Sequence, residues 1–118
     1  MERSKVLAAL SALAHESRLE LVRMLMAQGE TGLSAGAIGE RLGLAASRLS
    51  FHLSALEQAG LIRSRRSSRN MIYTIDVDGM AGTVAYLVSD CCCGDPRIAA
   101  CCRPAAEQDH SPAGTENT

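Results

Sequence analysis

The sequence predicts a mainly α-helical domain that carries one β-hairpin. Apolar residues recur at helical spacing along most of the chain up to about Asp90. Aromatic residues make up only 3%, so the core has to be built from Leu, Ala, Val, Ile and Met, which favours helices. The period changes once, between Leu61 and Ile75, to a pattern typical of strands. At 118 residues, the chain has the length of one domain with a modest core.

Four helices are predicted in the first half of the chain, over residues 4–14, 19–29, 34–42 and 45–59. His15, Glu16 and Ser17 interrupt the apolar pattern between the first two. Ser34 is expected to be the N-cap of the third helix, because its hydroxyl can accept a hydrogen bond from a free backbone N–H group. Gly43 and Leu44 make a tight turn before the fourth helix, which Gly60 closes.

The second half begins with two predicted strands, residues 61–66 and 71–75, joined by a turn at residues 67–70. A last helix is predicted over residues 78–90. The segment 91–102 follows it and contains all the cysteines, and residues 103–118 are polar enough to predict a disordered tail. We therefore expect a helical domain over residues 1–90, a cysteine segment and a tail.

Positive charge is concentrated in one part of the chain. Six arginines and one acid, Glu57, lie between Arg41 and Ile75, although the whole chain has a net charge of −1. Two short helices joined by a tight turn and followed by a basic hairpin form a winged helix-turn-helix, in which the second helix enters the major groove of DNA. A solvated basic hairpin on an ordinary helical domain is the alternative. The placement of all six arginines on the elements that would face DNA argues against it.

The predicted DNA contacts lie on the fourth helix and on the hairpin. Arg48 can bind guanine or a phosphate, and the hairpin arginines would meet phosphates or the minor groove. His52 lies near the leucine face, so a structural or phosphate-contacting role is favoured over a metal ligand. The full set is Ser47, Arg48, Ser50, Phe51, His52, Ser54, Arg63, Arg65, Arg66 and Arg69.

The five cysteines are Cys91, Cys92, Cys93, Cys101 and Cys102. A disulfide scaffold is a poor explanation, because a bridge stabilises by closing a long loop and neighbouring cysteines close almost none. Clustered thiols are instead a multidentate ligand for a soft ion. Five thiols could also supply the four ligands of a tetrahedral zinc or cadmium site. No residues are spaced like a catalytic triad, and no CxxC motif is present, so an enzyme is not expected.

Three segments resemble the ArsR/SmtB family of metal-responsive repressors: LSALAHESRLELVRMLM, SRLSFHLSALEQAGLI and RSRRSSRNMIYTI. The resemblance covers roughly residues 5–90 and is most specific in SFHLSALEQAGLI. It implies a homodimer with elements in the order α-α-α-α-β-β-α, in which the first and last helices form the dimer interface. It also implies that the ion-free dimer represses by covering operator DNA, and that ion binding lowers the affinity for DNA.

The resemblance also bears on the inducer site. Many arsenic-responsive members carry a CxCxxC-like motif at the third helix, but residues 32–38 contain no cysteine. The last helix lacks the His and carboxylate pairs of the zinc-responsive members. A third subgroup ends this helix in AYL-xxx-CC, followed by a later cysteine, and binds trivalent arsenic or antimony within one subunit.

That match places Cys91 and Cys92 on the adjacent pair, with Cys93 as an extra thiol. The later ligand is Cys101 or Cys102; the shorter reach favours Cys101, and Cys93 is a further alternate. Arsenite is the expected inducer and antimonite a second candidate.

Two alternatives keep the same scaffold. One senses a soft metal such as Cd, Pb or Zn, and the other senses oxidants through a Cys93–Cys101 disulfide. A cytoplasmic location is expected, because the sequence contains no membrane-length apolar run and no signal peptide.

Overall fold

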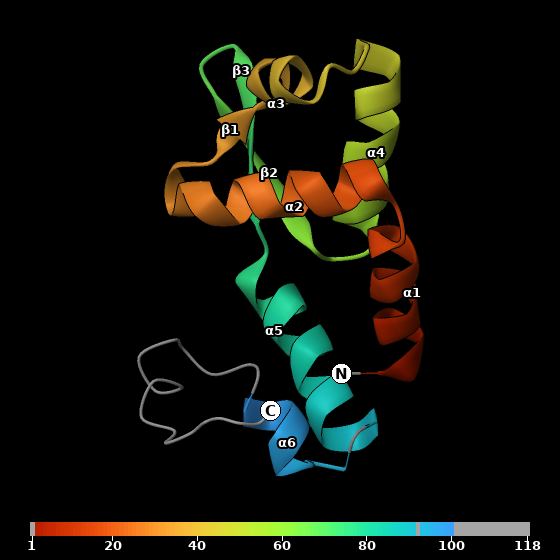
Figure 1. Ribbon diagram of the computed structural model, residues 1–118. Helices are drawn as coiled ribbons and strands as arrows, with labels where there is room; N and C mark the ends of the chain where they lie inside the picture. Colours follow the sequence, from red (N-terminus) through yellow and green to blue (C-terminus); the bar gives the residue numbers. More distant parts are fainter. Residues whose placement is uncertain (1, 92, 101–118) are drawn as a thin grey trace, which may run out of the picture. The chain divides into compact units, whose positions relative to one another are not determined.

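The computed structural model describes residues 2–91 and 93–100, with the backbone alone at Cys91 (Figure 1). The chain forms two compact units that divide between Thr83 and Val84. Its elements, in order, are α1 (Arg3–Leu13), α2 (Glu16–Gln28), η1 (Gly29–Thr31), β1 (Leu33–Ser34), α3 (Ala35–Leu42), α4 (Ala46–Gln58), β2 (Ile62–Ser67), β3 (Asn70–Ile75), α5 (Val77–Ala85), η2 (Tyr86–Cys91) and α6 (Pro96–Ala99). The predicted class, mainly helical with a β-hairpin wing, is confirmed.

Aliphatic side chains from four helices and from the start of the hairpin form the core of the first unit. The largest fully buried ones are Leu21, Leu25, Ile38, Leu56, Leu61 and Ile62. Burying a side chain of this size contributes about 1.5–3 kcal/mol, so the core needs no aromatic centre. Because α1 buries only Val6 and two alanines, it packs closely against its neighbours, while Leu7 and Leu10 stay at the surface.

The turn between α3 and α4 is built as the sequence predicts. The Ser34 hydroxyl accepts a hydrogen bond from the Ala37 N–H group at 3.2 Å and caps α3. Gly43 ends α3 in the left-handed conformation, with φ of 67°, which glycine adopts at no steric cost. The chain can then reverse within three residues, and α4 follows α3 across this turn (Figure 1).

The wing is an antiparallel pair, β2 and β3, in which Arg63 lies opposite Thr74 and Arg65 opposite Ile72. Strand β1, which the sequence does not predict, pairs with β3 on its other side, so the sheet order is β1-β3-β2. Two residues are too few for an alternating pattern to be visible. The sheet attaches the wing to the chain segment that leads into α3.

The last predicted helix is only partly correct. The α-helix ends at Ala85 and continues as a π-helical turn, η2, as far as Cys91. The apolar spacing of Val84, Leu87 and Val88 does not distinguish i→i+4 from i→i+5 hydrogen bonds, so an uninterrupted α-helix to Asp90 was wrong. A short helix, α6, was also missed; the Asp95 carboxylate caps it by accepting from the Arg97 N–H group at 2.8 Å.

Several expectations fall outside the described residues. They concern Cys92, Cys101, Cys102, the side chain of Cys91 and the predicted tail at residues 103–118. Within the described ranges, 2–91 and 93–100, no helix has the length and apolar character needed to cross a membrane.

Candidate nucleic-acid interface

Helix α4 presents the predicted reading residues on its outer side. Its inner side is fixed by Leu49, Leu53 and Leu56, which are all buried. Residues between these leucines therefore face outward, and Ser47, Arg48, Ser50, Phe51 and Ser54 are exposed. A helix that buries one side in this way can offer the other to base edges in the major groove.

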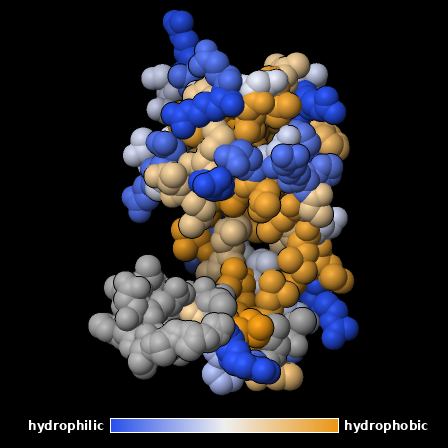
Figure 2. Space-filling view, viewed as in Figure 1, coloured by the Kyte–Doolittle hydropathy of each residue, from blue (hydrophilic) through white to orange (hydrophobic). Residues whose placement is uncertain are grey.

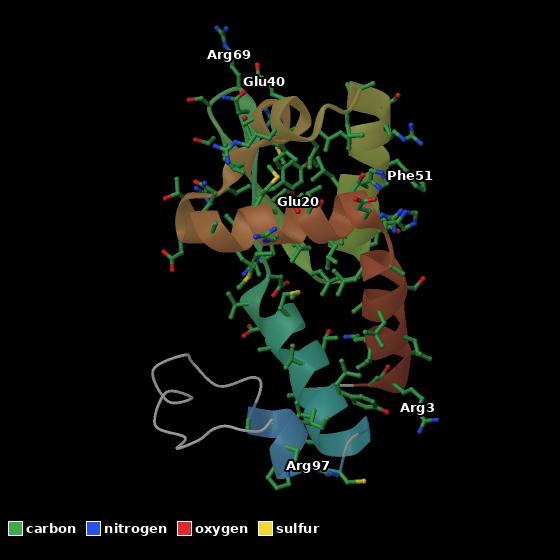
Figure 3. The ribbon with its side chains drawn as sticks, viewed as in Figure 1. Arg3, Glu20, Glu40, Phe51, Arg69 and Arg97 are labelled. Carbon is green, nitrogen blue, oxygen red and sulfur yellow. The ribbon has the colours of Figure 1, made fainter. Side chains whose placement is uncertain are left out.

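Phe51 is the most prominent apolar group on this helix. Its side chain is 64% exposed and projects from α4 (Figure 3). The guanidinium carbon of Arg18 lies 5.3 Å from the centre of the ring, within the range of a cation–π contact. An exposed ring held in this way can make apolar contacts with a thymine methyl group in the major groove.

His52 is the one predicted DNA-contacting residue on α4 that is buried, with 6% exposure. Its Nδ1 accepts a hydrogen bond from Nε of Arg18 at 3.0 Å, and its ring meets the His15 ring edge-on at 5.7 Å between centres. Burial lowers the pKa of His52 below its ordinary 6.5, and the positive charges of Arg18, His15 and Arg48 lower it further. The histidine is therefore neutral near pH 7 and packed between helices.

The wing arginines Arg63, Arg65, Arg66 and Arg69, for which contacts with DNA were predicted, are all exposed. Arg69 projects from the end of the hairpin (Figure 3). Figure 2 shows strongly hydrophilic residues gathered at the end of the first unit that carries the wing. The wing and α4 are also joined directly: the Ser64 hydroxyl donates a hydrogen bond at 2.8 Å to Glu57, the acid within the arginine-rich segment. The exposed side of α4 and the wing therefore belong to one packed unit.

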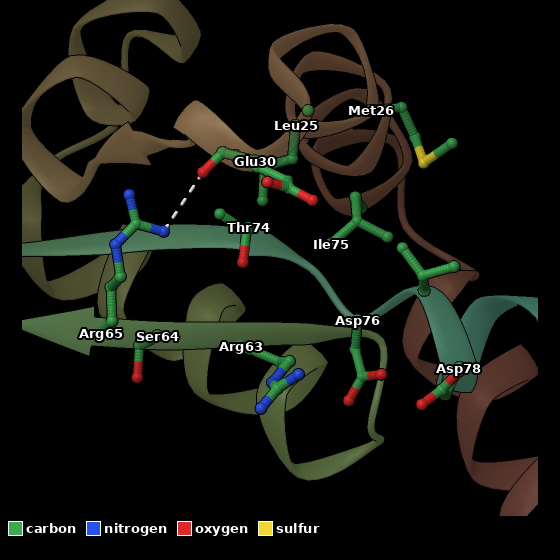
Figure 4. A pocket seen from close by; sticks show the side chains of 12 residues that line it. Leu25, Met26, Glu30, Arg63, Ser64, Arg65, Thr74, Ile75, Asp76 and Asp78 are labelled. Carbon is green, nitrogen blue, oxygen red and sulfur yellow. Dashed lines mark hydrogen bonds between the residues drawn. The ribbon is translucent and has the colours of Figure 1, made fainter.

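Arg65 differs from the other wing arginines, because its guanidinium already has partners. It donates to the carbonyl oxygen of Glu30 at 3.2 Å (Figure 4) and to the carbonyl oxygen of Thr31 at 3.3 Å. Both carbonyls lie in η1, just past the end of α2, where a helix leaves acceptors unsatisfied. Arg65 thus ties the wing to α2 with part of its hydrogen-bonding capacity.

A cavity of about 720 Å³ lies beside this contact, between the end of α2, the wing and the start of α5. Arg63, Asp76 and Asp78 supply charges of both signs to its wall (Figure 4). A second cavity, of about 610 Å³, lies between α3 and α4 and is lined by small residues such as Gly36, Gly39 and Ala46.

Arg18 is a residue of this region that was not predicted from the sequence. It lies one turn before Leu21 and Val22 and two turns before Leu25, so it falls on the buried stripe of α2. An arginine on an apolar stripe is the signal that could have identified it. Its Nη1 also donates to the Ala12 carbonyl oxygen at 3.3 Å.

The second unit holds the described part of the cysteine segment. Cys93 is exposed and has a left-handed backbone, with φ of 56°. The Gly94 N–H group donates to the Val88 carbonyl at 2.8 Å and closes the turn after η2. Among the described residues, no group of three or more His, Cys, Asp or Glu side chains is placed so that it could hold a metal ion.

Comparison with known proteins agrees with this interface. Residues 13–65 match a family described as a helix-turn-helix domain. The chain is 35% identical over 85 residues to the HTH-type transcriptional regulator YgaV of Escherichia coli K12, covering 72% of this chain and 84% of YgaV. This chain belongs to the helix-turn-helix transcriptional regulators of the ArsR/HlyU type. Its relatives regulate transcription and are not enzymes.

Many solved structures resemble this regulator, among them the following three. An ArsR-like transcriptional regulator from Rhodococcus sp. RHA1 matches with a TM-score of 0.67 and 27% identity, covering 82% of this chain and 89% of its own. Reduced HlyU from Vibrio cholerae matches with a TM-score of 0.58 and 32% identity, over 71% and 86%. The homodimeric winged helix-turn-helix DNA-binding domain of Mb0332 from Mycobacterium bovis matches with a TM-score of 0.60 and 29% identity, over 74% and 80%. The regulator thus shares its winged helix with DNA-binding proteins.

Proposed function

We propose that this regulator is a repressor that binds operator DNA as a homodimer and leaves it when trivalent arsenic or antimony binds its C-terminal thiols. One observation carries the proposal: all five cysteines lie within residues 91–102, a segment that begins at the last residue of η2, the π-helical turn that follows α5. The proposed ligands are Cys91, Cys92 and Cys101, with Cys102 or Cys93 as alternates.

The chemistry of the ion suits such a segment. Arsenite is an arsenic(III) trihydroxide, and three thiols replace its hydroxides in turn. Each step forms one As–S bond, breaks one As–O bond and releases one water that carries the thiol proton, so no electrons are transferred. Soft thiolates prefer a soft ion of this kind over hard cations. Three thiolates are enough to complete the arsenic–sulfur pyramid.

The start of α5 offers a route from the thiols to the reading helix. The Asp76 N–H group donates to the Leu61 carbonyl at 2.9 Å, and the Asp76 carboxylate caps α5 by accepting from Gly79 at 3.1 Å. Leu61 follows α4 after only two residues. We infer that an ion ordering residues 91–102 acts through α5 on the end of α4. A coupling of about 1–3 kcal/mol would change DNA affinity about 5- to 150-fold.

A homodimer is supported by the surface of α1. Leu7 is 58% exposed and Leu10 37%, and apolar residues are visible along this helix (Figure 2). The similar domain of Mb0332 is homodimeric. A dimer would place two α4 helices against half-sites about 34 Å apart, so a small change in their separation would weaken binding.

The test is fluorescence anisotropy on a DNA duplex selected from a random library by the wild-type protein. Affinity is measured with and without arsenite for the wild type and for Cys→Ser changes at each of the five cysteines. Loss of arsenite-induced release in Cys91→Ser and Cys92→Ser, with DNA binding retained, is the expected result. Release that persists in the double variant would refute the assignment. X-ray absorption on the arsenic-loaded protein should count three sulfur neighbours.

Thiol oxidation is the second candidate, favoured by the exposure of Cys93. A Cys93–Cys101 disulfide would form as peroxide takes two electrons and two protons from the thiols and becomes water. This mechanism predicts release by peroxide in the absence of any metal. A soft-metal sensor would instead respond to Cd, Pb or Zn with four sulfur ligands. Treating the same protein–DNA complex with arsenite, peroxide and Cd²⁺ separates the three mechanisms.

A further inference from the structure

Arg18 is a buried cation without a carboxylate partner in the described part of the chain. Its residue is 6% exposed, and the ion pairs described there join other residues, such as Arg23 with Glu20. Its partners are neutral: Nδ1 of His52, the Ala12 carbonyl and the face of Phe51. Burying a charge is costly unless its hydrogen bonds are made. The two hydrogen bonds of Arg18 are therefore a strong constraint on the groups that accept them.

The hydrogen bond to His52 determines where the histidine carries its proton. A guanidinium donates and never accepts, and it keeps its charge in proteins. Nδ1 of His52 must therefore present its lone pair, and the proton of the neutral ring must lie on Nε2. A doubly protonated ring would place an N–H group against the Arg18 donor. The structure thus requires one charge state and one tautomer of His52.

The same contact joins three helices. Ala12 belongs to the last turn of α1, where carbonyl groups lack helical partners, Arg18 belongs to α2, and His52 lies in the middle of α4. His52 is next to exposed Phe51 and one turn from exposed Arg48. Movement of His52 about the axis of α4 would change where Arg48 and Phe51 point.

We propose that Arg18 is a positioning residue for DNA reading: by holding Nδ1 of His52, it fixes the rotation of α4, and protonation of His52 releases this hold. This inference rests on the DNA-binding part of the proposed function and is independent of the inducer. The charged and titratable groups that face His52 are Arg18 from α2, His15 at the start of α2 and Arg48 on α4. All are basic, so no neighbour among them would stabilise the protonated ring.

The first experiment is ¹⁵N NMR of the histidine rings in the full-length wild-type protein between pH 5 and 8. At pH 7.5 the expected spectrum of His52 is that of the neutral Nε2–H tautomer, with Nδ1 as acceptor. An Nδ1–H tautomer, or a protonated ring at this pH, would overturn the inference without any substitution. The His52 signals are assigned by their disappearance in the His52→Asn variant.

The second experiment compares substitutions of His52 that differ in the position of the acceptor. In His52→Asn the amide oxygen takes the place of Nδ1 and cannot titrate near neutral pH, whereas His52→Gln places its oxygen near Nε2. Affinity for the selected duplex is measured by anisotropy from pH 5.5 to 8. We expect Asn to bind within about twofold of the wild type, and Gln to bind roughly tenfold more weakly, since a hydrogen bond to a charged group is involved.

The pH profile and Arg18 variants complete the test. The wild type should lose affinity as His52 protonates, while His52→Asn should lack this loss. The DNA affinity of Arg18→Met should match that of His52→Gln. Thermal unfolding shows whether each variant folds. If Arg18→Met does not fold, the comparison of His52→Asn with His52→Gln decides the test. Equal affinity of the Asn and Gln variants at every pH would overturn the proposal. A wild type that selects no DNA would overturn this inference and the proposed function together, whereas failure of arsenite to release DNA would affect the proposed function alone.

Discussion

Gly79, in the first turn of α5, lies directly against the backbone carbonyl of Gly60, the second residue after the end of α4. A Cβ atom built on Gly79 would overlap the Gly60 carbonyl, so no other residue fits there without a shift of backbone. The facing group is rigid main chain rather than the end of a flexible side chain. The proposed link between the C-terminal helix and α4 is therefore a backbone-to-backbone contact.

Replacing Gly79 with alanine should push α5 away from the end of α4. Overpacking at a rigid contact typically costs about 1–3 kcal/mol, so the midpoint of chemical denaturation should fall. The proposed arsenite-induced change in DNA affinity should shrink as well, because α5 would no longer contact Gly60 as it does in the wild type. Denaturation followed by circular dichroism and anisotropy with arsenite measure the two effects.

Gly36→Ala is the matched control for Gly79→Ala. Gly36 is also helical, but a Cβ at this position meets only the Ser34 hydroxyl oxygen at 4.0 Å. Alanine there should raise stability by up to about 1 kcal/mol through helix propensity. If Gly79→Ala were as stable as this control, the contact with Gly60 would not restrict α5.

The winged helix was predictable because its signals are local. Leucines on α4, the Ser34 cap and Gly43 each specify a conformation from the residue type and its spacing. Such local signals do not predict contacts between distant segments, and Arg65 is an example. Its position on the wing was predictable, but its bonds to the carbonyls of Glu30 and Thr31 join segments that are distant in the sequence. No periodicity in the wing indicates that this arginine also holds α2.

The pairing of Arg18 with His52 was missed for a related reason. Each residue was visible as a polar group on an apolar stripe, but the two are 34 positions apart. The packing of α2 against α4 decides that they meet. The predicted end of the last α-helix was wrong for a different reason. An apolar stripe does not indicate which carbonyl oxygen each backbone N–H group bonds to, so it cannot distinguish an α-helix from a π-helix.

Substitutions in the wing should separate positioning from phosphate contact. Arg69→Ala removes an exposed charge at the end of the hairpin, so we expect weaker DNA binding, a salt-dependence slope reduced by about one and unchanged stability. Arg65→Ala also removes two hydrogen bonds to η1, each contributing about 0.5–1.5 kcal/mol, so its stability should fall. Anisotropy at several salt concentrations measures the loss of DNA binding in each variant, and chemical denaturation measures the loss of stability. Equal stabilities would indicate that the Arg65 bonds contribute little.

The Ser34 cap gives a prediction for the helix-turn-helix itself. Ser34→Ala removes the acceptor for the Ala37 N–H group and should lower the free energy of unfolding by about 1 kcal/mol. Ser34→Asp, which retains an acceptor, should recover most of this loss. Urea denaturation of the three proteins checks the order. An alanine variant as stable as the wild type would show that water replaces the cap without cost.

The stability of the whole protein should depend on the protonation of His52. Its pKa is lowered in the fold, first by burial and then by Arg18, His15 and Arg48, whereas the unfolded chain titrates near 6.5. Below that value the unfolded state binds the proton more readily, so the free energy of unfolding should fall as pH drops through 6.5 toward the folded pKa. In His52→Asn this part of the pH dependence should vanish. Urea denaturation at steps between pH 5 and 8 measures both slopes. Identical slopes would mean that another group causes the pH dependence, because removing His52 would then leave the slope unchanged.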